Sequence, residues 1–98
     1  MSDRVLVTDA LTADLGPDHT LPVATLGGLE VGLWAMAPGA AEDTEVDEVC
    51  LVLAGRGTVA FDDGEVVDLA PGVVLQLRAG EHTTWTVTET IRKVYVAR

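Results

Sequence analysis

Five carboxylates lie between residues 42 and 48, directly before an apolar segment that begins with Glu48. Alternate side chains of a β-strand point to opposite faces, so Glu48, Cys50 and Val52 are predicted to share one face of that segment. An isolated carboxylate on an interior face costs several kcal/mol unless it has a partner, a ligand or water. A binding cavity is expected around Glu48 if this face points into the interior; if Glu48 instead lies in solvent at the strand start, the acidic run is a solvated loop.

His82 and Cys50 are the two side chains that could share chemistry with Glu48. His82 follows the turn at residues 78–80 and could serve as an acid, a base or a hydrogen-bond donor, with an exposed loop histidine as the alternative. Cys50 is predicted to share the face of Glu48 and to contact a substrate there. A nucleophilic role would need a base within hydrogen-bond reach, whereas most buried cysteines are small inert side chains. Glu48 and His82 are thus the predicted catalytic residues.

Gln76, Trp34 and Tyr95 are the other candidate substrate contacts. Gln76 is a polar side chain on an apolar segment, and small-molecule sites place a few polar groups among apolar ones. Its alternative is a solvent-facing position. Trp34 could stack on a substrate, although large aromatic side chains more often pack in a core or a dimer interface. Tyr95 alternates with valines, so Lys93 and Tyr95 together face either the cavity or the solvent.

Short strand-like segments follow one another from residue 29, separated by Gly, Pro or Asp-Gly turns. Valine and threonine contribute 15 and 11 residues, and β-branched side chains favour strands. The turn signals are PG, GRG, DDG and AG, and GRG at residues 55–57 is predicted to separate two strands. This pattern indicates an all-β domain of the sandwich or barrel type, without β-α-β units.

The composition favours one small folded domain. Hydrophobic residues make up 48% of the 98 residues, which excludes a disordered chain. The formal net charge is -10 and the six basic residues are scattered, so neither nucleic acid nor an anionic membrane is an expected partner. A single cysteine, no signal peptide and no apolar segment of about 18 residues together predict a cytoplasmic location.

Several short motifs occur in an order that resembles the cupin superfamily. They are W-x3-PG at 34–39, Glu48 with Gly55, PG at 71–72, RAG at 78–80, Trp85 and RKVYV at 92–96. Within that superfamily the chain resembles the small single-domain cupins related to ureidoglycine aminohydrolase and to the ethanolamine-utilisation cupin. The resemblance implies a single antiparallel β-barrel, jelly-roll-like, over residues 29–98, with residues 1–28 as an N-terminal arm or edge strand. It also implies a homodimer, since exposed sheet edges in so short a chain would be a liability.

In metal-binding cupins a His-x-His pair precedes the glutamate, and the resemblance places that pair within residues 41–44, where this chain has no histidine. His82 stands one position before the histidine of the second cupin motif. The resemblance therefore implies no bound cofactor. The alternative is a divalent metal held by Glu48, His82 and either Glu42 or Asp43, although first-row transition metals favour sites with more imidazole ligands.

The expected function is that of a small-molecule-binding cupin with non-redox acid/base activity, as an isomerase, lyase or hydrolase, on a small polar metabolite. Glu48 would transfer protons, and His82 and Gln76 would orient the substrate. One alternative is a non-catalytic ligand-binding or accessory module. Another is a metalloenzyme with a non-standard Glu/His site.

Overall fold

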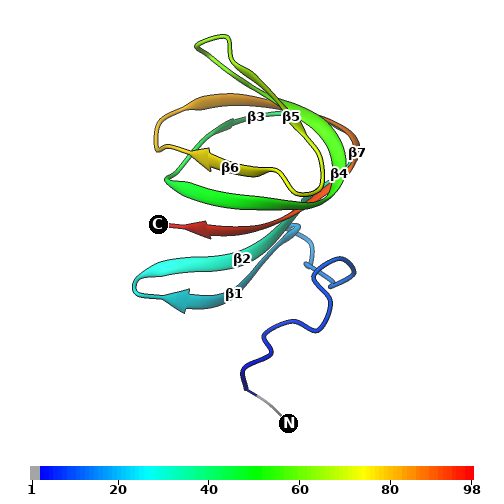
Figure 1. The fold of residues 1–98 in the computed structure, drawn as a ribbon, viewed down its shortest axis with the longest axis vertical. Coiled ribbons are helices and arrows are strands. Elements are labelled where there is room, and N and C mark those ends of the chain that lie inside the picture. Colours follow the sequence, from blue (N-terminus) through cyan, green and yellow to red (C-terminus); the bar gives the residue numbers. More distant parts are fainter. Residues whose placement is uncertain (1–2) are drawn as a thin grey trace.

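Seven antiparallel strands make up the fold in the computed structural model, which describes residues 3–98 (Figure 1). They are β1 (Thr20–Leu26), β2 (Leu29–Met36), β3 (Gly39–Thr44), β4 (Glu48–Phe61), β5 (Val66–Leu69), β6 (Val74–Leu77) and β7 (His82–Ala97). The described chain contains no helix of the length and hydropathy needed to cross a membrane. The predicted all-β, jelly-roll-like fold is confirmed.

The two longest strands, β4 and β7, lie at the centre of the sheet and pair with each other along their whole length. The first half of β4 also pairs with β6, and its second half pairs with β5. In the same way, the start of β7 pairs with β3 and its end pairs with β2. Because both long strands are bent, the two halves of the sheet curve toward each other and enclose the core (Figure 1).

The GRG segment is the place where β4 bends, and the prediction that it separates two strands is wrong. The strand is continuous through residues 55–57, but its register with β7 shifts there. Gly55 has a φ of 99°, and a Cβ at this position would meet the Thr90 carbonyl of β7. Glycine therefore permits both the positive φ and the close approach of the two backbones, as in a β-bulge. A bulge and a turn carry the same glycine signal in a sequence.

Strand alternation places the core as the pattern predicts. Cys50 and Val52 on β4 are buried, whereas Val49, the residue before Cys50, is 47% exposed. On β7 the residues Trp85 and Val87 are buried. The inward faces of the two bent strands therefore line one interior, and the prediction that Glu48 shares the face of Cys50 is confirmed.

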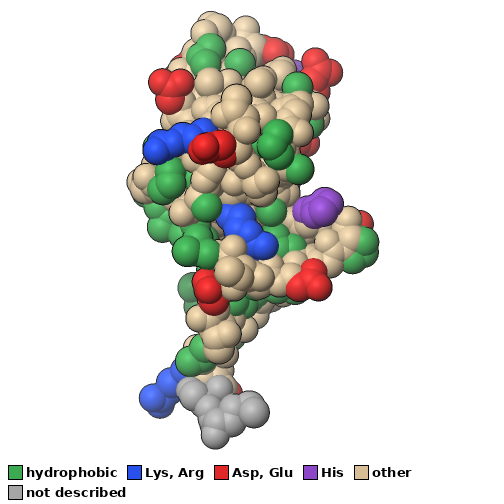
Figure 2. Space-filling model, turned by 90° about the vertical axis from the view of Figure 1, so that its right-hand side faces the viewer, with side chains coloured by type: hydrophobic (Ala, Val, Ile, Leu, Met, Phe, Trp, Pro, Cys, Tyr) green, Lys and Arg blue, Asp and Glu red, His purple; other side chains and the backbone are tan. Residues whose placement is uncertain are grey.

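Residues 3–19 precede the sheet as an irregular segment that is tied to β7. The Arg92 guanidinium donates hydrogen bonds to the carbonyls of Ala10 (2.9 Å) and Ala13 (2.8 Å). Leu15 is buried, and β1 then pairs with β2 at the sheet edge. Residues 1 and 2 of the predicted arm lie outside the described residues. Figure 2 shows acidic side chains spread over one face of the molecule, and none of the basic side chains gathers into a patch there.

Candidate functional site

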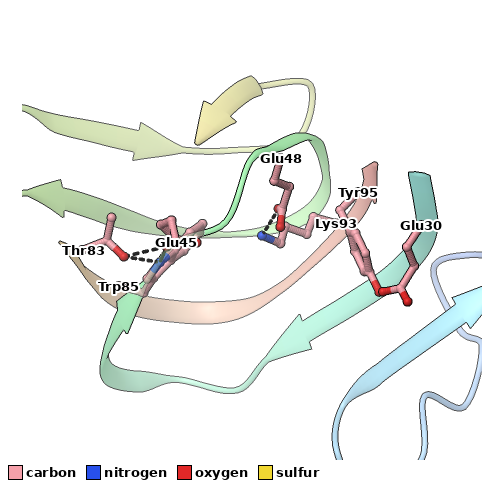
Figure 3. A network of polar contacts seen from close by, with 7 residues as sticks. All are labelled: Glu30, Glu45, Glu48, Thr83, Trp85, Lys93 and Tyr95. Atoms are coloured by element: carbon pink, nitrogen blue, oxygen red, sulfur yellow. Dashed lines mark hydrogen bonds and ion pairs between the residues drawn. The ribbon is translucent and has the colours of Figure 1, made fainter. Parts of the chain in front are cut away.

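An ion pair between β4 and β7 lies at the centre of the site (Figure 3). The Lys93 ammonium donates a hydrogen bond of 2.6 Å to Glu48 Oε2. The side chains are 6% and 11% exposed, respectively, so both charges are largely removed from bulk water. Such a burial is favourable only when each charge has a close partner. Glu48 is therefore the inward-facing carboxylate that the sequence predicts, and Lys93 is its partner.

The register of three neighbouring strands explains why these side chains meet. Residues paired across strands share a face of the sheet, and β7 lies between β2 and β4. The three inward-facing rows are Trp34, Lys93 and Val52, then Gly32, Tyr95 and Cys50, then Glu30, Ala97 and Glu48. Lys93 reaches along β7, over the second row, to Glu48 in the third.

Two tryptophans flank the ammonium group. Lys93 Nζ lies 4.6 Å from the ring centroid of Trp34 and 4.8 Å from that of Trp85. The two rings are 5.5 Å apart and tilted by 56°. A ring face attracts a cation within about 6 Å of its centroid. The Lys93 charge is therefore balanced by one carboxylate and two aromatic faces.

Glu45 is a buried carboxylate that fixes the position of Trp85. Its Oε2 accepts hydrogen bonds from the Thr83 hydroxyl (2.6 Å) and from Trp85 Nε1 (3.0 Å), and the residue is 7% exposed. Backbone bonds from Glu45 to Glu81 and from Gly80 to Glu45 hold the loop in place. A solvated acidic loop is the interpretation that the charge run favours, and for Glu45 this interpretation is wrong.

Tyr95 and Glu30 form the other end of the site. The Tyr95 hydroxyl donates a hydrogen bond of 2.7 Å to Glu30 Oε2. Gly32 makes room for the tyrosine, because a Cβ there would overlap the Tyr95 ring and hydroxyl. Burial, together with the bond to Glu30, raises the pKa of Tyr95. The phenol is therefore a neutral hydrogen-bond donor at neutral pH.

These groups line a cavity of about 300 Å³. Its walls contain the carboxylates of Glu30, Asp43, Glu45 and Glu48, the ammonium of Lys93 and the rings of Trp34, Trp85 and Tyr95. A volume of this size is at the lower end of small-molecule sites, and the wall carries more charged groups than the few polar groups that are typical of them. The arrangement can accept, hold and exchange protons with a small polar molecule.

Cys50 lies in the core next to this cavity and not in its wall. Burial raises the pKa of its thiol to about 11; Lys93 opposes this effect, and Glu48 adds to it. The thiol is therefore protonated at neutral pH, whereas a nucleophilic cysteine must be a thiolate. The structure places Cys50 as a small buried side chain.

Neither His82 nor Gln76 joins Glu48 in the wall of this cavity, although Gln76 and Glu48 both line a separate surface hollow of about 340 Å³. His82 begins β7 opposite Thr44, whereas Glu48 pairs with Ala97 at the other end of that strand. The His82 ring is exposed, and its Nδ1 lies 3.1 Å from the Thr44 hydroxyl, in a surface hollow of about 590 Å³. Gln76 pairs with Val49 on the outer face of the sheet and is exposed. Among the sequence candidates, the structure brings together Glu48, Trp34 and Tyr95.

The residues of the alternative metal site do not fit a metal. Glu42 lies exposed on β3 in the same surface hollow as His82 and Asp43, and this hollow does not include Glu48. Within residues 3–98 no three His, Cys, Asp or Glu side chains form a group that could hold a metal ion. The Glu48 carboxylate is already paired with the Lys93 ammonium at 2.6 Å. The polar groups of this cavity instead pair with one another, Lys93 with Glu48 and Tyr95 with Glu30.

The model of the EutQ-like cupin domain family matches residues 23–95. A search of curated proteins finds no match to the chain. A protein of unknown function from Rhizobium leguminosarum has a similar crystal structure, with a TM-score of 0.73 and 31% sequence identity over 84% of this chain and 83% of that one.

Two other solved structures show the same fold. The EutQ protein of Clostridium difficile has a TM-score of 0.68 and 24% identity over 80% of this chain. This chain spans 64% of that protein, which is less than two thirds of its length. A cupin superfamily protein from Desulfitobacterium hafniense has a TM-score of 0.66 and 20% identity, over 80% of this chain and 73% of that one.

Proposed function

The chain belongs to the family of EutQ-like cupin domains, and on that premise we propose that it binds a small polar metabolite in its cavity and transfers protons on it without a redox step. The resulting reaction is an isomerisation, an elimination or a hydrolysis. A cytoplasmic location is part of the proposal, because the single cysteine, Cys50, is free.

The Lys93–Glu48 contact of 2.6 Å in a cavity wall is the observation that supports this proposal. A carboxylate can accept a proton from a bound ligand, and an adjacent ammonium can stabilise the negative charge that develops or return a proton. Both groups lie on paired strands, and their side chains are only 6% and 11% exposed, which strengthens the electrostatic interaction between them. Lys93 is thus the second catalytic residue beside Glu48, the role predicted for His82 from the sequence.

Proton exchange with solvent tests the proposal before a substrate is known. The protein is incubated in D2O with mixtures of amino acids, ureido acids and sugars, and loss of carbon-bound proton signals is followed by NMR. We expect exchange at a carbon of at least one metabolite or, if the reaction is a hydrolysis, conversion of that metabolite in the same spectra. Glu48→Gln keeps an acceptor for Lys93 but removes the base, so we expect exchange to slow by about 100-fold or more, within the usual range for a lost general base.

Glu65→Gln is the matched control, because it removes the same charge in an exposed turn far from the cavity wall. Its exchange rate should equal that of the unmodified protein. Equal rates for Glu48→Gln and the unmodified protein would contradict the role of Glu48. A protein that binds metabolites but exchanges and converts none of them would instead be the non-catalytic binding module.

We also propose that the protein is a homodimer whose copies meet through one sheet face. Val49 on β4, Val74 on β6 and Val96 on β7 point outward on adjacent strands and are 47%, 67% and 37% exposed. At the border of this valine face, Asp47 and Arg98 carry opposite charges 3.7 Å apart. A two-fold axis would bring Asp47 of one copy to Arg98 of the second copy, and Arg98 of the first to Asp47 of the second. Exposed valines on three adjacent strands, with Gln76 between them on the same face, give a mixed apolar and polar surface of the kind found at interfaces.

Sedimentation velocity at micromolar concentration should show a dimer. Val49→Lys places an unpaired charge in the middle of the valine face, and we expect it to weaken dimerisation by about 100-fold. Val66→Lys, on the exposed side of β5 and outside the valine face, is the control and should remain dimeric. A monomeric unmodified protein would contradict the proposal.

A further inference from the structure

The charge of the cavity wall points to a class of ligand. We infer that the cavity takes a small organic cation with N–H donors, a primary ammonium or a guanidinium group. This inference rests on the proposed function, since it assumes that the cavity is a ligand site.

The cavity wall repels anions. Four carboxylates and one ammonium, all in the wall, give it a formal charge of -3, within a chain whose net charge is -10. An anionic ligand would find its only cation, Lys93, already paired with Glu48 at 2.6 Å. A cationic ligand would compensate carboxylates that Lys93 leaves unbalanced. Walls of one sign in a low-dielectric cleft also raise the local concentration of the oppositely charged ligand.

The aromatic part of the wall already holds an ammonium group. Lys93 Nζ lies within 5 Å of the centroids of Trp34 and Trp85, so these rings contact the same kind of group that the ligand would bring. The rings belong to different strands and are held by the sheet register and by the bond from Trp85 to Glu45. The ring faces near Lys93 are already occupied by its ammonium group, so the carboxylates of the wall, and not the rings, would bind the cationic group of the ligand.

The carboxylates of the wall favour a cation that can donate hydrogen bonds. Among residues 3–98, the side-chain hydrogen bonds that Glu30 and Glu45 accept engage Oε2, from Tyr95 in one case and from Thr83 and Trp85 in the other. A carboxylate offers about four acceptor positions, so both retain capacity for N–H donors. Charge-assisted bonds of this type are shorter and stronger than neutral ones. A quaternary ammonium group could not form them.

Tryptophan fluorescence can report binding at this cavity alone, because the chain has two tryptophans and both lie in its wall. The probes are butylammonium, 1-butanol and butanoate at neutral pH, which share a four-carbon chain and differ in charge. We expect butylammonium to change the emission saturably and to bind at least about tenfold more tightly than 1-butanol, with no saturable change for butanoate. Tetramethylammonium should bind more weakly than butylammonium, because it has no N–H donor.

Glu30→Gln removes one charge from the wall and keeps an oxygen acceptor for Tyr95. It should weaken butylammonium binding by about fivefold, while Glu65→Gln, with the same change in net charge, should leave it within about twofold of the unmodified protein. Asp43→Asn removes another wall charge and provides a second test if Glu30→Gln is unstable.

Preferential binding of butanoate, equal binding of 1-butanol and butylammonium, or no response to any probe would overturn the inference. Equal weakening by Glu30→Gln and Glu65→Gln would also overturn it, because the effect would then come from net charge and not from the wall. The proposed function is judged separately, by proton exchange in the Glu48→Gln variant. A protein that exchanges protons on an anionic or neutral metabolite would retain the proposed function and lose the cationic ligand class.

Discussion

Lys93→Met is expected to destabilise the protein by about 3–5 kcal/mol, as measured by urea unfolding. Methionine keeps an unbranched apolar side chain of similar length, so the packing against Trp34 and Trp85 is largely preserved. The ammonium that neutralises Glu48 is lost, however, and a carboxylate with a side chain only 11% exposed remains without its partner. An uncompensated charge in such a position is far more costly than the loss of a surface ion pair.

The double variant Lys93→Met with Glu48→Gln separates the charge from the packing. With both charges removed, no ion remains unpaired, and we expect most of the lost stability to return, since buried ion pairs contribute little relative to neutral replacements. If the free energy of unfolding of Lys93→Met lies within about 1 kcal/mol of that of the unmodified protein, the prediction is wrong. Glu48 would then have access to water, and the ion pair would not determine the structure of this part of the interior.

Glu45→Ala should destabilise the protein by about 2–4 kcal/mol, because two buried donors lose their acceptor. The Thr83 hydroxyl and the Trp85 indole N–H both bond to Glu45 Oε2, and an unsatisfied buried donor costs about 1–3 kcal/mol. The hydroxyl and the indole can still contact each other at 3.1 Å, which keeps the expected loss below the sum of two unsatisfied donors. Urea unfolding measures the loss.

Two other variants make the Glu45 prediction specific. Glu45→Gln retains an oxygen that can accept from Trp85 and Thr83, so its loss of stability should be smaller than that of Glu45→Ala. Glu42→Ala, an exposed carboxylate on neighbouring β3, should change stability by no more than about 0.5 kcal/mol. Similar losses for Glu42→Ala and Glu45→Ala would mean that the acidic segment acts as a solvated charge run.

The sequence alone determined the features that depend on local periodicity. Two-residue alternation on β4 placed Glu48 with Cys50 and Val52 on one face, because the pleat of a strand is fixed over a few residues, and the resemblance to cupins implied that this face is the inner one. Frequent turn signals and β-branched residues indicated an all-β fold, and the order of motifs around Glu48 and Trp85 indicated the family.

Only the tertiary structure decided which side of each strand became the cavity and which partners met there. Alternation alone allowed Lys93, Tyr95 and Gln76 to face either the interior or the solvent. In the structure β7 lies between β2 and β4, and this pairing directs Lys93 and Tyr95 inward. The pairing of β6 with β4 directs Gln76 outward. Glu45 gave no signal in an acidic run, because its partners, Thr83 and Trp85, lie about 40 residues away. Lys93 and Glu48 are 45 residues apart. A contact across such a distance depends on sheet register and on the bend at Gly55, and neither is encoded in the few residues around each member of the pair.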